Sequence, residues 1–113
     1  MLFNSANDVI FVHEVDEDGT PSNFVEANDI ACKTLGYARD ELLKLSPFDI
    51  DAHYKQAEII NIMKQGTEKG LVFETHLSTK SRNEIPVEMS LFLFKLKGKT
   101  FAQAILIIDR FCE

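Results

Sequence analysis

Residues 28–43 read NDIACKTLGYARDELL, and this stretch decides the fold that the sequence predicts. Asn28 or Asp29 is suited to begin a helix, because a short polar side chain accepts a hydrogen bond from the free N–H groups of the first turn. Gly36 can adopt the left-handed conformation that commonly follows the last residue of a helix. A second helical segment over residues 39–45 has its acidic residues first, as the helix dipole favours. The stretch therefore predicts two short, consecutive helices.

The sequence before and after these helices predicts strands and one longer helix. Residues 8–15 and 23–26 are rich in β-branched and aromatic side chains and flank an acidic, glycine-containing turn, which is typical of a hairpin. Residues 52–65 carry apolar side chains at helical spacing. This order indicates an α+β domain with its helices gathered on one side of an antiparallel sheet. The sheet is completed by three further predicted strands, over residues 71–79, 84–95 and 101–109.

Length, composition and charge exclude several classes of protein. With 113 residues, 45% of them hydrophobic and 27% charged, we expect residues 1–113 to form one globular domain. A formal charge of −6 argues against nucleic-acid binding, which needs clustered Lys and Arg. No run approaches the ~20 apolar residues of a membrane span, and the N-terminus lacks the features of a signal peptide. We therefore expect a cytoplasmic protein whose Cys32 and Cys112 are reduced.

Two of the predicted strands are apolar at every position over part of their length. Residues 91–94 read LFLF, and residues 104–108 read AILII. An antiparallel sheet with one solvated face should instead alternate between apolar and polar residues. Edge twist and chain ends are one explanation, but an exposed apolar patch usually marks an interface. We therefore expect the helices to cover one face of the sheet and a partner chain or flanking helix to cover the other.

No group of residues predicts catalysis. His13, His53 and His76 each lack a neighbour at ligand spacing, and a structural zinc site would need about four Cys or His ligands in short-spaced pairs. The five glycines form no phosphate-binding loop. We therefore expect that the domain itself is not an enzyme.

The segment from Asn28 to Leu43 resembles a pattern of the PAS (Per-Arnt-Sim) sensory domains. That pattern is Asn-x-Ala-x-x-x-x-x-Gly-Tyr-x-x-x-Glu-Leu, and the chain departs from it at Ile30 and lacks the common capping Ser or Thr at Ala38. The resemblance extends over essentially the whole chain, although the Asp-Ile-Thr motif that follows the family's last strand keeps only Asp109. It implies a PAS-like five-stranded antiparallel sheet with helices packed on one face.

The resemblance also implies a role in signalling. A PAS domain of this kind would bind a small ligand in a core pocket and form a homodimer through the outer sheet face. It would thereby regulate a covalently linked output domain, such as a histidine kinase or a diguanylate cyclase, within a larger signalling protein. The alternative is a pure protein–protein interaction module with a filled core and no ligand.

Three cofactors known from PAS relatives can be compared with these residues. A covalent flavin adduct is disfavoured, because Cys32 is not in the Asn-Cys-Arg-Phe-Leu-Gln context that the resemblance would require. Haem ligation by His53 and non-covalent FAD binding stay open but are not favoured. His53 lies too early on its predicted helix, and the Trp common in FAD pockets is absent.

The pocket candidates come from the strand orientation that the resemblance implies. In that orientation one face of the last two strands points at the residues 52–65 helix, and the rim carries the few polar groups that fix a ligand. Each candidate can equally be an ordinary core residue. The candidates are Asn28, Ile60, Met63, Phe73, Leu77, Val87, Met89, Leu91, Gln103, Ile105 and Ile107.

Overall fold

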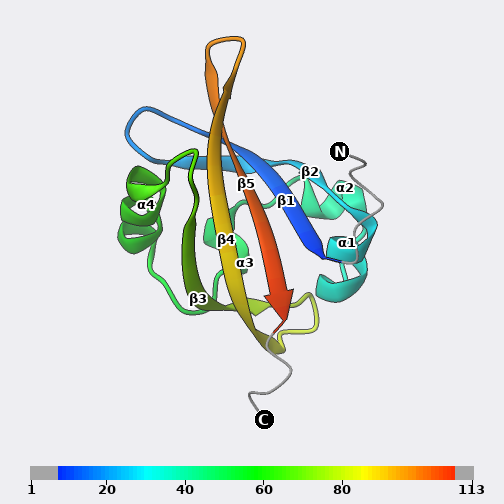
Figure 1. The fold of residues 1–113 in the computed structure, drawn as a ribbon. Helices are drawn as coiled ribbons and strands as arrows, with labels where there is room; N and C mark the ends of the chain where they lie inside the picture. The colour runs from blue at the N-terminus through cyan, green and yellow to red at the C-terminus, as the bar shows by residue number, and fades with distance from the viewer. Residues whose placement is uncertain (1–7, 109–113) are drawn as a thin grey trace.

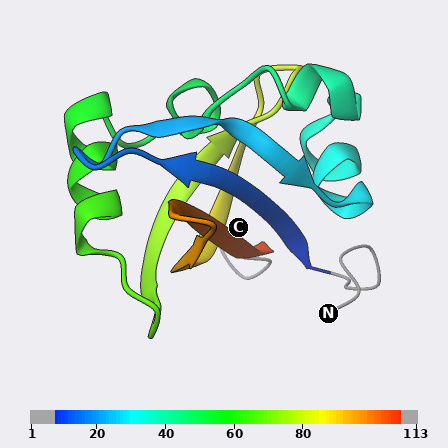
Figure 2. The same cartoon turned by 90° about the horizontal axis from the view of Figure 1, so that it is seen from above.

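The computed structural model describes residues 8–108, which form a five-stranded antiparallel sheet in the order β2-β1-β5-β4-β3. All four helices lie on one side of this sheet (Figures 1 and 2). The predicted α+β architecture is thereby confirmed. The elements in chain order are β1 (Val9–Val15), β2 (Pro21–Ala27), α1 (Asp29–Leu35), α2 (Arg39–Leu42), α3 (Pro47–Ile50), α4 (Gln56–Gln65), β3 (Leu71–Ser78), β4 (Glu84–Leu96) and β5 (Lys99–Ile108).

Asn28 is fully buried and joins helix α1 to strand β1. Its side-chain oxygen accepts hydrogen bonds from the backbone N–H of Ala31 at 3.0 Å and from that of Ile10 at 3.1 Å. Its amide nitrogen donates to the carbonyl of Asp8 at 2.7 Å. The first of these bonds caps the helix, and the other two hold the helix start against the neighbouring strand. Gly36, with φ of 81°, ends the helix as the sequence predicts.

Helix α3 was not expected from the sequence. Ser46 caps this helix, because its hydroxyl oxygen accepts from the N–H of Phe48 at 3.2 Å. The carboxylate of Asp49 accepts in return from the N–H of Ser46 at 2.8 Å. Proline is well suited to the first helical position, where its missing N–H would have no partner. Pro47 therefore starts helix α3, whereas α2 already ends at Leu42.

The long helix begins later than the expected residue 52, at Gln56. The preceding residues form a turn around the carboxylate of Asp51, which accepts from the N–H groups of His53 at 2.9 Å and Tyr54 at 2.7 Å. The other carboxylate oxygen accepts from the hydroxyl of Thr75 on β3 at 2.9 Å. Because Asp51 holds these residues in a turn against the sheet, helix α4 begins about one helical turn later than expected.

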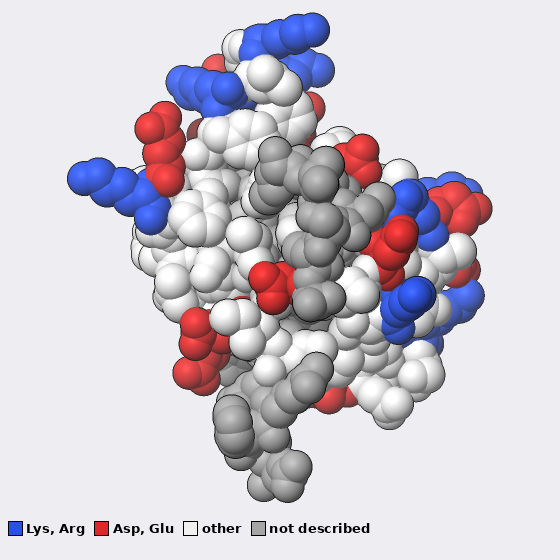
Figure 3. All heavy atoms as spheres, turned by 45° about the vertical axis from the view of Figure 1, so that its right-hand side comes forward, with Lys and Arg blue, Asp and Glu red and all other residues white. Residues whose placement is uncertain are grey.

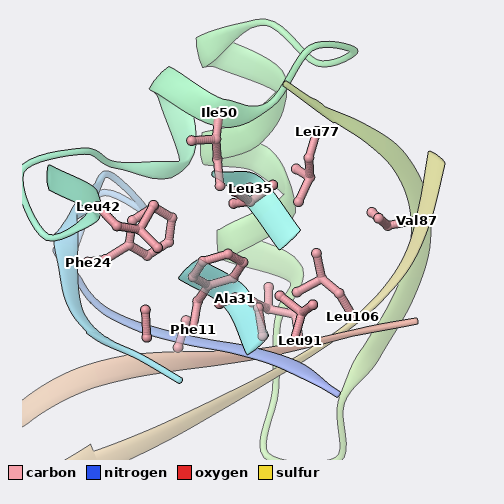
Figure 4. Close-up of a cluster of buried hydrophobic side chains, with 14 of the residues drawn as sticks. Phe11, Phe24, Ala31, Leu35, Leu42, Ile50, Leu77, Val87, Leu91 and Leu106 are labelled. Carbon is pink, nitrogen blue, oxygen red and sulfur yellow. The ribbon is translucent and has the colours of Figure 1, made fainter. Parts of the chain in front are cut away.

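The helices and the inner face of the sheet enclose one hydrophobic core (Figure 4). Phe11 and Phe24 come from adjacent strands, and their ring centroids lie 4.8 Å apart. Leu35 and Leu42 reach this core from α1 and α2, and both are buried. Leu91 lies on the opposite wall of the core, on β4, and is also buried. The core therefore joins elements that are far apart in the sequence.

The other face of the sheet, called the outer face below, is also rich in apolar side chains. Strand register places Phe92 opposite Gln103 and Phe94 opposite Phe101. The rings of Phe94 and Phe101 stack with their centroids 5.6 Å apart. No helix of residues 8–108 covers this face, and Ile107 is 56% exposed on it. The strands are therefore apolar on both faces, as the sequence indicates.

Replacing Asn28 should destabilise the fold strongly. In Asn28→Ala the helix loses its cap and the buried N–H of Ile10 loses its acceptor, so the free energy of unfolding should fall by about 2–4 kcal/mol. Urea denaturation followed by circular dichroism measures this change as a lower midpoint with an unchanged slope. Asn61→Ala on the exposed face of α4 is the matched control and should change stability little. A loss below about 1 kcal/mol for Asn28→Ala would contradict this role.

Candidate functional site

A small cavity of about 30 Å³ lies in the core between the inner face of the sheet and helices α3 and α4. Space of this size holds little more than a water molecule or two. Most of the surrounding side chains are apolar, and the polar ones belong to His13 and Asp51. The lining residues are Phe11, His13, Phe24, Pro47, Ile50, Asp51, Ile59, Ile62, Met63, Phe73, Leu77, Met89, Leu91 and Ala104.

His13 is the titratable group that burial affects most in this site. Its side chain is only 1% exposed, its ring lies edge-on to Phe24, and burial lowers its pKa from 6.5 to about 4. The ring Nδ1 lies 3.1 Å from the backbone carbonyl of Glu14, a contact that opposes this shift. A carbonyl oxygen only accepts, so Nδ1 carries the proton and Nε2 is left as an acceptor. At neutral pH the cavity therefore has a neutral imidazole in its wall.

Asp51 is already engaged by the protein. Its two oxygens accept hydrogen bonds from the N–H groups of His53 and Tyr54 and from the hydroxyl of Thr75. A carboxylate with this many protein donors holds the turn between α3 and α4 against the sheet. Of the two polar residues around the cavity, His13 is the one whose acceptor atom, Nε2, is not already used to hold a turn in place.

Two methionines give the wall of the cavity room to move. Met63 comes from α4 and Met89 from β4, and both line the cavity. Methionine is unbranched and flexible, so it fills irregular gaps and can change rotamer to make space. The volume of 30 Å³ is therefore the space present in this arrangement of side chains.

Five of the predicted pocket residues line the cavity together, and the ligand-binding role of each stays a prediction. These are Met63, Phe73, Leu77, Met89 and Leu91.

The other predicted residues lie elsewhere. Asn28 is the cap of α1, Val87 is a core residue 3% exposed, and Ile60 faces the β1–β2 turn near Gly19. None of these three is among the residues that line the cavity.

The orientation predicted for β5 was wrong by one residue. Ile105 and Ile107 were expected to point inward with Gln103 at the rim, but all three lie on the outer face, and Ala102, Ala104 and Leu106 are buried. The apolar run in β5 contains no alternation that could fix its register. Alanines face the interior because Ala104 pairs with both Phe11 and Leu91, whose side chains fill the space.

His13, Phe11, Phe24, Ile50 and Ala104 line the cavity but were not among the predicted pocket residues. The alternation in β1 already places His13 on the same face as its apolar neighbours, which was the available signal. Ile50 belongs to the unexpected helix α3, and no sequence pattern indicated it.

The remaining sequence features lie outside the cavity. His53 is exposed and packs edge-on against Tyr54, with ring centroids 4.6 Å apart. Within residues 8–108 no three His, Cys, Asp or Glu side chains are grouped to hold a metal ion. None of the helices in that range has the length and hydrophobicity to cross a membrane. Asp109 and Cys112 lie outside the described residues.

Acid should destabilise the protein through His13. Its folded pKa of about 4 is below the unfolded value of 6.5, so the unfolded state binds the proton more readily between these pH values. This contribution to the free energy of unfolding is complete above pH 6.5, and about 3 kcal/mol should be lost as the pH falls to 4. Urea titrations across this range measure it. His13→Phe should remove this part of the pH slope, whereas His76→Gln, at an exposed histidine, should keep it. Equal slopes for His13→Phe and the parent would refute the assignment.

Comparisons with known proteins agree with this fold. A 26% identical relative over 99 residues is the methyl sulfide methyltransferase-associated sensor of Methanosarcina acetivorans; the match covers 87% of this chain but 10% of that protein. The PAS domain of an HTR-like protein from Haloarcula marismortui superposes with a TM-score of 0.81 at 27% identity, covering 96% of this chain and 86% of that one. A PAS domain from a two-component sensor histidine kinase gives 0.77 at 24% identity, with 96% and 90% covered. The family model described as "PAS domain" matches residues 7–109, and the chain therefore belongs to the PAS domain family.

Proposed function

We propose that this chain is a cytoplasmic, signal-sensing PAS input domain of a longer signalling protein. It binds a small molecule in the core cavity, dimerises through its outer sheet face and regulates a linked output domain, a histidine kinase or a diguanylate cyclase. The observation that carries the proposal is a neutral, buried imidazole in the wall of an otherwise apolar cavity. An apolar cavity with few polar groups is the usual form of a small-molecule site. The sensor in Methanosarcina acetivorans supports a sensory role by similarity.

The chemistry of the cavity restricts its ligand. An anionic molecule would lose its hydration without gaining a counter-charge, because His13 is neutral and the carboxylate of Asp51 would repel it. Nε2 of His13 is an acceptor, so a compact apolar molecule with one O–H or N–H donor fits best. Movement of Met63 and Met89 supplies the additional space.

Pyrrole and furan are matched probes of this preference, because they have the same size and only pyrrole has an N–H donor. Pyrrole should bind at least tenfold more tightly than furan, which corresponds to about 1.4 kcal/mol. Nuclear magnetic resonance titrations of the cavity methyl groups measure both dissociation constants. His13→Phe should remove the preference, because the acceptor is lost.

The control variants separate the cavity from the surface. Ala104→Leu fills the cavity and should abolish binding of both probes, whereas Ala57→Leu on the exposed side of α4 should leave both unchanged. Equal affinities of pyrrole and furan would overturn the donor preference. Binding of both probes to Ala104→Leu as to the parent would overturn the cavity as the ligand site.

The second candidate is a pure interaction module with a filled core. The observation that favours it is the volume of about 30 Å³, well below the several hundred Å³ of typical ligand sites. Native mass spectrometry and an absorbance scan of freshly purified protein distinguish the two functions. A retained small molecule supports sensing. A ligand-free protein that binds neither probe but still dimerises supports the interaction module.

The exposed apolar side chains of the outer face support a dimer for both candidate functions. Val72 is 61% exposed and Ile107 is 56% exposed there, beside the half-buried rings of Phe92, Phe94 and Phe101. A contiguous apolar face of this kind usually marks an interface.

Ile107→Lys should weaken the dimer without unfolding the domain. The side chain is largely exposed in the monomer, so the substitution puts a charge into the proposed interface and changes the core little. Size-exclusion chromatography with light scattering should record a dissociation constant at least tenfold higher, or about 1.4 kcal/mol. Ala57→Lys on the helix side is the control and should dimerise as the parent does. A parent chain that stays monomeric at high concentration would exclude this dimer.

A further inference from the structure

Charges of opposite sign lie at opposite ends of the outer face. Lys97 and Lys99 lie at the turn of the β4–β5 hairpin, both are exposed, and we call them the lysine end. Lys95 does not belong to it, because it pairs with Thr100 and has the inward orientation of Leu91 and Leu93. This hairpin projects beyond the rest of the sheet in Figure 1, and Lys and Arg gather at the same end in Figure 3. The broad uncharged area of Figure 3 lies below it.

The glutamate end lies at the other end of the same two strands and on β3. Glu74, Glu84 and Glu88 are all exposed, and strand register places them on the outer face. Glu74 and Glu88 stand directly opposite each other on neighbouring strands. Like charges in such a pair destabilise a sheet, so a cationic side chain near Glu74 and Glu88 would stabilise it.

The two ends are placed symmetrically about the middle of the β4–β5 ladder. The Phe92–Gln103 pair lies halfway between the Leu96–Lys99 pair and the Glu88–Ile107 pair. The outer pairs are about 26 Å apart, at ~3.3 Å per residue. Consider a two-fold axis that passes over the central pair, parallel to the sheet and perpendicular to the strands. It would place the Leu96–Lys99 pair of one copy over the Glu88–Ile107 pair of a second copy.

Such a packing would match apolar groups as well as charges. Leu96 is 57% exposed and Ile107 is 56% exposed, and each belongs to one of the two outer pairs. The packing would bury both and bring Lys99 of one copy near Glu88 of the other. Phe94 and Phe101 would then lie over the part of the second sheet that carries Ile105.

We propose that two copies of this chain pack outer face to outer face with their strands antiparallel, so that the lysine end of each lies on the glutamate end of the other. The proposal rests on the outer-face dimer proposed above and specifies its orientation. Each chain carries a formal charge of −6, so two copies repel unless opposite charges meet at the interface. A parallel packing would instead bring lysines to lysines and glutamates to glutamates.

Neighbouring acidic residues do not neutralise the lysine end. The nearest ion pair joins Lys99 to Glu14 at 3.9 Å, and the lysine side chain stays 64% exposed. The acidic turn at residues 16–18 lies by α4, where Gly19 approaches Ile60 and Lys64 acts on the pKa of Asp18. Lys97 and the largely exposed Lys99 are therefore available to a second copy.

Charge reversal tests the orientation on the whole chain. One variant carries Lys97→Glu and Lys99→Glu, a second carries Glu74→Lys and Glu88→Lys, and a third combines all four. Light scattering at low salt should record a dimer dissociation constant at least tenfold higher for each of the first two. The third should return to within about threefold of the parent, because its attractive pairs are restored with reversed signs. At about 1 M salt, where the Debye length is about 3 Å, these differences should shrink.

A matched control excludes a general effect of net charge. Lys33→Glu and Lys44→Glu together make the same charge change as the first variant at exposed sites on the helix side, and they should leave the dimer within about threefold of the parent. Circular dichroism checks that every variant is folded.

The outcomes separate this proposal from the dimer itself. A parent dimer whose dissociation constant is the same in the first two variants would overturn the antiparallel orientation and leave the outer-face dimer standing. Failure of the fourfold variant to recover, while it stays folded, would also overturn the orientation. A parent chain that is monomeric at all concentrations would overturn both.

Discussion

The fold depends on the buried side-chain amide of Asn28. Helix α1 is short, and a short helix has little stability of its own because nucleation is unfavourable. The amide oxygen accepts from the first turn of this helix and from Ile10 at the same time, so the helix begins only where β1 is in place. Local and tertiary structure are thereby fixed by one side chain. With α1 held on the sheet, Leu35 reaches the core and the chain can turn into α2 and α3.

The second constraint is that β4 and β5 are apolar on both faces. On the inner face the interior is crowded, because Ala104 stands opposite Phe11 on one side and Leu91 on the other. The small residue leaves a cavity of about 30 Å³ rather than a clash. On the outer face the bulky apolar residues are exposed or half-buried, and they form the proposed dimer interface. The same pair of strands thus accounts for both the small size of the cavity and the apolar surface.

The sequence predicted the fold more completely than the site. The start of α1 at Asn28 or Asp29, its end at Gly36 and the succession of five strands along the chain follow from local rules of capping, turn formation and alternation. The inward face of β5 does not follow, because alternation carries no information where every residue is apolar. Helix α3 does not follow either, since Pro47 fits both the end of one helix and the start of another. Five cavity residues were identified through the strand orientation that the resemblance to PAS domains implies.

The cavity and the proposed interface are close enough to affect each other directly. Leu91 lines the cavity, and its neighbour Phe92 points to the outer face from the same strand. Ala104 and Gln103 are related in the same way on β5. A ligand that displaced Met89 and moved this part of β4 would therefore also tilt Phe92 on the outer face, because the strand itself separates the cavity from that face. Because packed strands shift as units rather than deform smoothly, such a displacement would favour one dimer packing over another. A small cavity is suited to this mechanism, since even a compact ligand must move its walls in order to enter.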